Sequence, residues 1–87
     1  MQTIENISTA WMRADEQASF ESGKTYQIQN AGVNEVILRE DAAAPAAGKA
    51  GIILSRGMFV DYGPADNPLW VRSPGPSVLV IWEKSNA

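Results

Sequence analysis

The last strand that the sequence predicts, at residues 77–83, is apolar on both of its faces. Successive side chains of a strand point to opposite sides of the sheet. One face therefore carries Val78, Val80 and Trp82, and the other carries Leu79 and Ile81. A small antiparallel domain usually buries one face of a sheet and leaves the other in water. Either two layers of the same chain or a second chain must cover this strand.

The bulk of Trp82 favours the core for the face that it shares with Val78 and Val80. Leu79 and Ile81 then point away from the core and need a different cover. Loops of the same chain or a second subunit would supply it, and in the second case Leu79 and Ile81 are interface residues; we take both as candidates for that role.

The chain has 87 residues and neither cysteine nor histidine. This length predicts a single domain over residues 1–87, and a domain so short buries only about 60–65% of its unfolded surface. Small domains gain stability from disulfides, metals or partner subunits. Disulfides and zinc bound through Cys or His are excluded here, so we expect partner subunits.

The net charge is −3, and the seven basic residues are scattered along the chain. Nucleic-acid binders usually cluster their Lys and Arg residues, so we expect no nucleic-acid partner. No apolar stretch approaches the ~20 residues of a membrane span, and the N-terminus lacks the basic and apolar regions of a secretion signal. We therefore expect no membrane association and synthesis in the cytoplasm.

Glycine and proline divide the chain into short segments, which is typical of an all-β fold. Residues 25–30 alternate between apolar and polar side chains, as a half-buried strand does. The predicted strands span residues 8–14, 17–21, 25–30, 34–40, 50–56, 58–60, 69–73 and 77–83. We expect a small antiparallel β-sandwich or barrel with a short N-terminal arm at residues 1–7, an exposed loop at 41–48 and a frayed tail at 84–87.

Catalysis has few candidates, because a Ser-His-Asp triad and a cysteine nucleophile are both absent. The remaining candidates are neighbouring carboxylates, which are Asp15 with Glu16, Glu40 with Asp41, and Asp61 with Asp66. They fall at strand ends and in loops, where solvated carboxylates are common, so we expect no enzyme and no catalytic residue. Asp61, Asp66 and Asn67 could offer oxygens to calcium, but their spacing matches no EF-hand. We expect no metal and no cofactor.

Tryptophan and arginine recur together on two predicted strands. Trp11 shares a face with Arg13, and Trp70 shares a face with Arg72. Both residue types are enriched at protein interfaces, which makes Trp11, Trp70 and Arg72 candidate interface residues. Two alternatives stay open: the tryptophans fill the core, or an exposed tryptophan such as Trp70 stacks on sugar rings.

The order of segments resembles the small β-sandwich virion proteins of tailed bacteriophages. The resemblance covers residues 20–83 and rests on strand 25–30, the turn Ala31-Gly32, strand 35–40, Ala44-Pro45, residues 51–54, residues 69–73 and the final Val/Ile strand. It implies a structural role on the virion, as a capsid decoration or cement protein, or as a tail or head-fibre component. The resemblance brings no catalytic residues.

From this resemblance we expect a virion protein that is made in the host cytoplasm and acts by protein–protein contacts. Its partners would be the major capsid protein or other virion proteins, and copies of itself in a homo-oligomer, for which a trimer is one fitting arrangement. The rival function is a carbohydrate- or receptor-binding module.

Overall fold

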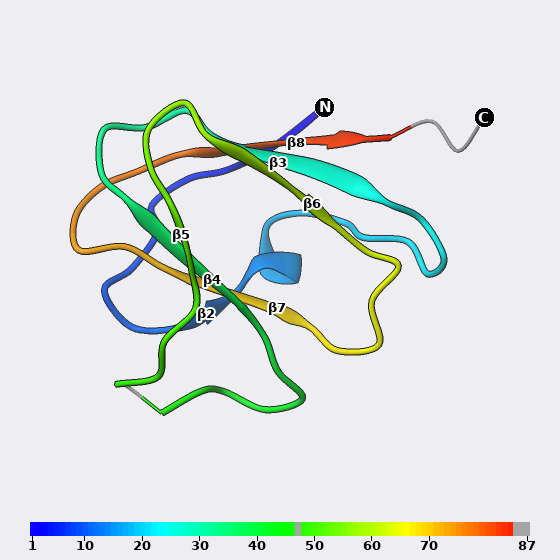
Figure 1. Ribbon diagram of the computed structural model, residues 1–87, viewed down its shortest axis with the longest axis horizontal. Coiled ribbons are helices and arrows are strands. Elements are labelled where there is room, and N and C mark those ends of the chain that lie inside the picture. The colour runs from blue at the N-terminus through cyan, green and yellow to red at the C-terminus, as the bar shows by residue number, and fades with distance from the viewer. Residues whose placement is uncertain (47, 85–87) are drawn as a thin grey trace.

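Alternating side chains on two central strands determine the two layers of the fold. In the computed structural model, which describes residues 1–46 and 48–84, strand β3 (Tyr26–Asn30) buries every second residue, and β4 (Val36–Glu40) buries Val36 and Leu38. The period of two gives each strand one inward and one outward face. Each strand lies at the centre of one four-stranded antiparallel sheet, and the two sheets pack face to face as a β-sandwich (Figure 1). The expected all-β sandwich is confirmed.

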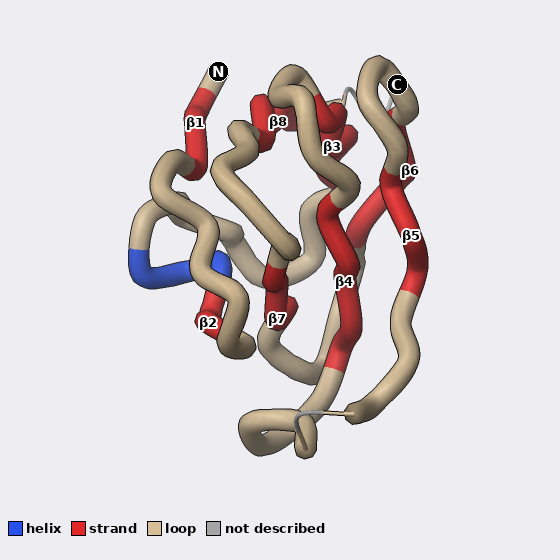
Figure 2. The backbone as a smooth tube through the Cα atoms, turned by 90° about the vertical axis from the view of Figure 1, so that its left-hand side faces the viewer, coloured by secondary structure: helices blue, strands red, loops and turns tan. Residues whose placement is uncertain are grey.

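Sheet A has the strand order β1-β8-β3-β6, and sheet B has the order β2-β7-β4-β5. The remaining strands are β1 (Gln2–Ile4), β2 (Met12–Arg13), β5 (Ile52–Leu54), β6 (Phe59–Tyr62), β7 (Leu69–Arg72) and β8 (Leu79–Glu83). A short 3-10 helix, η1 (Ala14–Glu16), follows β2. Seen from the side, β1 and β2 lie at one side of the sandwich, and β5 and β6 lie at the other (Figure 2).

The core lies between the inward faces of the two sheets. Ile28 of β3 and Ile81 of β8 supply its centre from sheet A, and Leu38 of β4 and Val71 of β7 supply it from sheet B. All four side chains are at most 2% exposed. Burial of this apolar area is the main favourable term in folding.

The face assigned to the core on the last strand was wrong. Leu79 and Ile81 are 0% and 1% exposed and lie in the core, whereas Trp82 is 36% exposed on the outer face of sheet A. The register explains the difference: Ile81 lies opposite Ile28, and Trp82 lies opposite Gln27. Cross-strand partners point to the same side of a sheet, so the polar side chains of β3 identify the wet face of β8.

Three predictions for residues 1–21 were also wrong. The expected free arm at 1–7 is instead an edge strand, because β1 pairs with β8 and buries Ile4 completely. Residues 17–21 form no strand; Ala18 is nevertheless buried, and Phe20 packs against the core. Strand β2 is also much shorter than the predicted 8–14. Of the expected tail at 84–87, residues 85–87 lie outside the described part of the chain.

A buried amide joins the two sheets at one end of the sandwich. The side chain of Asn30, fully buried at the end of β3, donates to the carbonyls of Asn34 and Leu54, at 2.8 Å each. Its Oδ1 accepts from the N–H of Gly32 at 2.9 Å and from the hydroxyl of Ser77 at 3.0 Å. Buried polar groups cost little only when they are paired in this way.

Asn30→Ala should lower the free energy of unfolding by roughly 2–4 kcal/mol, because it leaves several buried donors and acceptors without partners. Chemical denaturation measures the change. Gln27→Ala on the outer face of the same strand is the control and should stay within about 0.5 kcal/mol of the natural protein. A loss equally small for Asn30→Ala would show that the buried amide is not a structural link.

Candidate functional site

Tryptophan and arginine side chains gather on the outer face of sheet B. Strand β7 sends Leu69 and Val71 into the core, so Trp70 and Arg72 point outward. The register places Trp70 between Arg13 of β2 and Arg39 of β4. Trp11 precedes β2 and lies beside Arg72. We call these residues the Trp/Arg face; its members are Trp11, Arg13, Arg39, Trp70 and Arg72.

Two arginine–tryptophan contacts hold this face together. The guanidinium carbon of Arg72 lies 4.9 Å from the centre of the Trp11 ring, and that of Arg13 lies 6.0 Å from the centre of the Trp70 ring. Both lie within the range of cation–π attraction. Arg13 is also held by Asp15, with N···O distances of 3.0 and 2.6 Å. Contacts within the chain therefore orient Arg13 and Arg72 before any partner binds.

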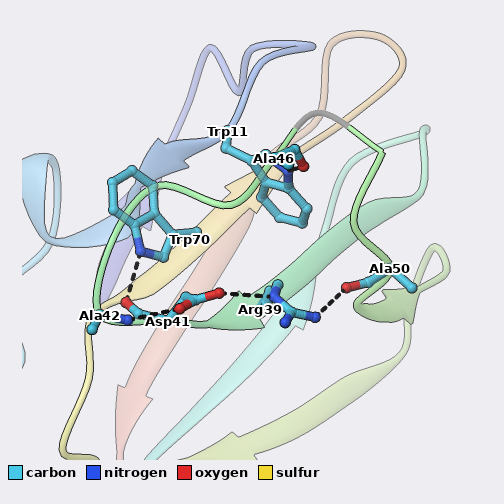
Figure 3. A network of polar contacts seen from close by, with 7 residues as sticks. All are labelled: Trp11, Arg39, Asp41, Ala42, Ala46, Ala50 and Trp70. Carbon is cyan, nitrogen blue, oxygen red and sulfur yellow. Dashed lines mark hydrogen bonds and ion pairs between the residues drawn. The ribbon is translucent and has the colours of Figure 1, made fainter.

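Residues 41–46 and 48–50 belong to a loop that passes beside Trp11, Arg39 and Trp70 of the Trp/Arg face (Figure 3). The indole N–H of Trp70 donates to the carbonyl of Asp41 at 2.9 Å, and the indole N–H of Trp11 donates to the carbonyl of Ala46 at 3.1 Å. Arg39 adds a bond to the Asp41 carboxylate at 3.1 Å and one to the Ala50 carbonyl at 2.8 Å. The loop is attached mainly through its backbone, while Ala42, Ala43 and Ala44 remain exposed.

The structure brings three of the five predicted interface residues together. Trp11, Trp70 and Arg72 lie on the Trp/Arg face, and all three are partly buried rather than fully exposed. Leu79 and Ile81 were wrong as interface residues, since both are buried in the core of the chain itself. Arg39 was not predicted, and Arg13 was noted only for sharing a face with Trp11; the register with Trp70 places both on this face, and that register depends on strand pairing.

One carboxylate of each pair considered for catalysis forms an ion pair with a nearby cation. Asp15 binds Arg13 at 2.6 Å, Asp41 binds Arg39 at 3.1 Å, and Asp61 binds Lys84 at 2.9 Å. These ion pairs lie at or near the surface, at strand ends and in loops. Nowhere in residues 1–46 and 48–84 do three or more acidic side chains gather closely enough to hold a metal ion.

A hollow of about 270 Å³, which the sequence did not indicate, opens at the end of the sandwich where β3 begins. Phe20 meets Tyr26 and Tyr62 edge to face, with ring centres 5.1 and 5.2 Å apart. Asp15 and Asp66 also line it. These rings come from three separate segments, so no local sequence pattern predicts the hollow.

The tyrosines of the hollow are held by backbone groups. The N–H of Glu21 donates to the hydroxyl of Tyr26 at 2.7 Å, and the hydroxyl of Tyr62 donates to the carbonyl of Asn67 at 3.1 Å. Burial raises the pKa of Tyr62, and the negative charges of Glu40 and Asp15 raise it further. A phenolate is disfavoured there, so Tyr62 remains a neutral hydrogen-bonding group.

The Trp/Arg face offers fixed aromatic and guanidinium groups beside an alanine-rich loop. Comparisons with protein-family models, curated proteins and solved structures found no match. In the described residues, no helix has the length and hydropathy of a membrane span. The Trp/Arg face has the residue types that dominate binding energy at protein interfaces, and the hollow has the aromatic and polar lining of a small-ligand site.

Trp11→Phe should release the loop at Ala46, because phenylalanine keeps the ring but has no N–H to donate. We expect trypsin to cut after Lys49 several-fold faster than in the natural protein, as measured by mass spectrometry of timed digests. Trp82→Phe, a matched change on the other sheet, should leave the rate unchanged. Equal rates in both variants would contradict an anchoring role for the Trp11 indole.

Proposed function

We propose that this protein is a structural component of a tailed-bacteriophage virion, and specifically a capsid decoration or cement protein. It would be made in the host cytoplasm, act by protein–protein contacts and catalyse no reaction. The observation that carries the proposal is the Trp/Arg face, in which indole and guanidinium groups are fixed before binding. The resemblance of the segment order to small phage β-sandwich proteins is the reason for placing this binding role on a virion.

The rigidity of the face supports a binding role. Association normally costs about 0.5–1.5 kcal/mol for each long side chain that a partner immobilises. Here Arg13 and Arg39 are already held by Asp15 and Asp41, and both indole N–H groups are already paired. The exposed parts of the rings and of the loop alanines can then contact the major capsid protein with little further ordering.

Repetition on a particle supports a cementing mechanism. A capsid presents many equivalent sites, so contacts that are weak singly become strong when copies also contact each other. The expected partners are the major capsid protein or other virion proteins, together with further copies of this chain. Alternatively, the protein is a tail or head-fibre component of the virion, and it would then bind through the same Trp/Arg face.

Reconstitution tests the decoration role. Particles that lack the protein should lose their integrity at a lower temperature, and adding the purified protein should restore it. Arg72→Glu should weaken binding to such particles at least about tenfold, because it reverses a charge at the Trp/Arg face. Arg56→Glu makes the same change on an exposed turn outside the face and should bind normally. Equal heat resistance with and without the protein would refute cementing.

A carbohydrate- or receptor-binding module is the second candidate. Trp70 suits this function poorly, because its indole N–H is used internally and Arg13 lies over its ring. The hollow beside Phe20, Tyr26 and Tyr62 is the observation that favours it, since aromatic rings next to carboxylate and amide groups can bind a sugar.

A glycan array separates the second candidate from the first. If the hollow binds sugars, the natural protein should give specific hits that Asp66→Ala reduces at least about tenfold, which a lost charged hydrogen-bonding group explains. Asp61→Ala removes the same charge outside the hollow and should retain the hits. An array without hits would exclude this candidate for the glycans it presents.

A further inference from the structure

The strand edges at the two sides of the sandwich differ in how far other segments of the chain cover them. At the β1 edge, the side chain of Gln2 exchanges two hydrogen bonds with the backbone of Ser19, at 2.8 and 2.7 Å. The side chain of Gln17 makes the same double exchange with the backbone of Glu5, at 2.9 and 3.0 Å. The segment around Ala18 thus lies against this edge, bonded to the Gln2 side chain and to the backbone of Glu5 just past the end of β1. Natural proteins cover strand edges in such ways to prevent unwanted pairing.

The opposite side, formed by β5 and β6, has no comparable cover among the described residues (Figure 2). Four large apolar side chains on these strands and their connecting turn are more than half exposed: Ile52 at 57%, Ile53 at 55%, Met58 at 51% and Phe59 at 61%. Neither strand carries the proline or lysine that commonly blocks an edge. We call this side the β5/β6 edge.

One of these side chains belongs to the core face. Ile52 lies opposite Leu38, which is 2% exposed, so both point toward the space between the sheets. Ile52 nevertheless reaches water, because no further strand of the described chain closes the sandwich there. A cavity of about 50 Å³ lies beside it and is also lined by Leu38 and Val60. The apolar core is therefore incomplete at this edge.

The backbone of β6 is ready to pair with another strand. The N–H of Asn30 donates to the carbonyl of Met58 at 2.9 Å. In antiparallel pairs, residues that bond to the neighbouring strand alternate with residues whose backbone groups face away. Phe59 and Asp61 therefore direct their N–H and C=O groups outward. The Asp61 carboxylate is paired with Lys84 at 2.9 Å, which reduces charge repulsion at the edge.

We infer that the β5/β6 edge binds a second copy of this chain, with β6 of one copy pairing antiparallel to β6 of the other about a twofold axis. A twofold axis normal to the sheets makes this pairing antiparallel and joins the two A sheets into one. It also brings the two β5 strands toward each other, so that Ile52 and Ile53 of each copy can cover those of the other. Each copy supplies the backbone partners and the apolar cover that the other lacks.

A second copy fits better than the alternative pairing of β6 with β1 of a neighbour. The segment around Ala18 of the same chain lies against the β1 edge and leaves little room for a neighbour, whereas no described segment lies against the β5/β6 edge in this way. A chain of 87 residues without cysteine also gains stability from a partner subunit. This dimer contact would serve the proposed virion function, and its role in a particle rests on that function. The dimer itself can be tested without particles.

Light scattering of the purified full chain across a dilution series tests the inference. The natural protein should have twice the 9.4 kDa mass of one chain and dissociate on dilution. Phe59→Lys should weaken the dimer at least about tenfold by placing a charge on the paired edge. Phe59→Pro should do the same by removing an outward N–H, while leaving the bonds between β3 and β6 in place. Val33→Lys is the matched control and should remain dimeric, because Val33 is 69% exposed and lies near Glu5 and Asn6, on the β1 side of the sandwich.

A monomer at every concentration, a trimer, or unchanged dimers of the folded Phe59 variants would overturn the inference. Thermal melting establishes that each variant is folded; if Phe59→Lys is not, Ile53→Lys takes its place. These outcomes are independent of virion binding. A dimer that does not bind particles would remove the decoration role alone, and a monomer that binds particles would remove the dimer alone.

Discussion

The fold depends on the buried side-chain amide of Asn30. A sandwich of two short-stranded sheets has few means of fixing one layer against the other, because apolar contacts have little directional preference. Asn30 belongs to β3 of sheet A, and its side chain donates to the carbonyl of Leu54 at the end of β5 in sheet B. The same side chain accepts hydrogen bonds from Gly32, in the segment before β4, and from Ser77, in the segment before β8. One residue thus fixes the relative position of four chain segments. A Cβ at Gly32 would collide with Ser77, so the close approach there also requires glycine.

The sequence predicted the fold class and the central strands because their signals are local. The alternation at residues 25–30 and the turn that follows are visible without knowing any strand partner, and β3 and β4 lie within the predicted ranges. The faces of β8 carry no such signal, since apolar residues stand on both. Only pairing with Gln27 and Gln29 determines which face is wet, and that pairing spans about fifty positions of the chain.

Parts of the candidate site could not be predicted from the sequence either, because they also depend on pairing between distant strands. The candidate pair of Trp70 and Arg72 was visible from alternation, but the position of Trp70 between Arg13 and Arg39 depends on the register of three strands. Strand β1 has three residues and only one fully buried side chain. Residues 17–21 resembled a strand, but Gln17 and Ser19 use their polar groups to bond the β1 edge rather than a neighbouring strand.

The loop over the Trp/Arg face is held by its backbone carbonyls at Asp41, Ala46 and Ala50. Carbonyl groups are the same in every amino acid, so these anchors do not depend on which side chains stand between them. Ala42, Ala43 and Ala44 can therefore be exchanged for other residues without disturbing the strands beneath. Selection on such a loop could change what the face recognises while the scaffold keeps its stability, and a library randomised at these three positions would start from a chain that still folds.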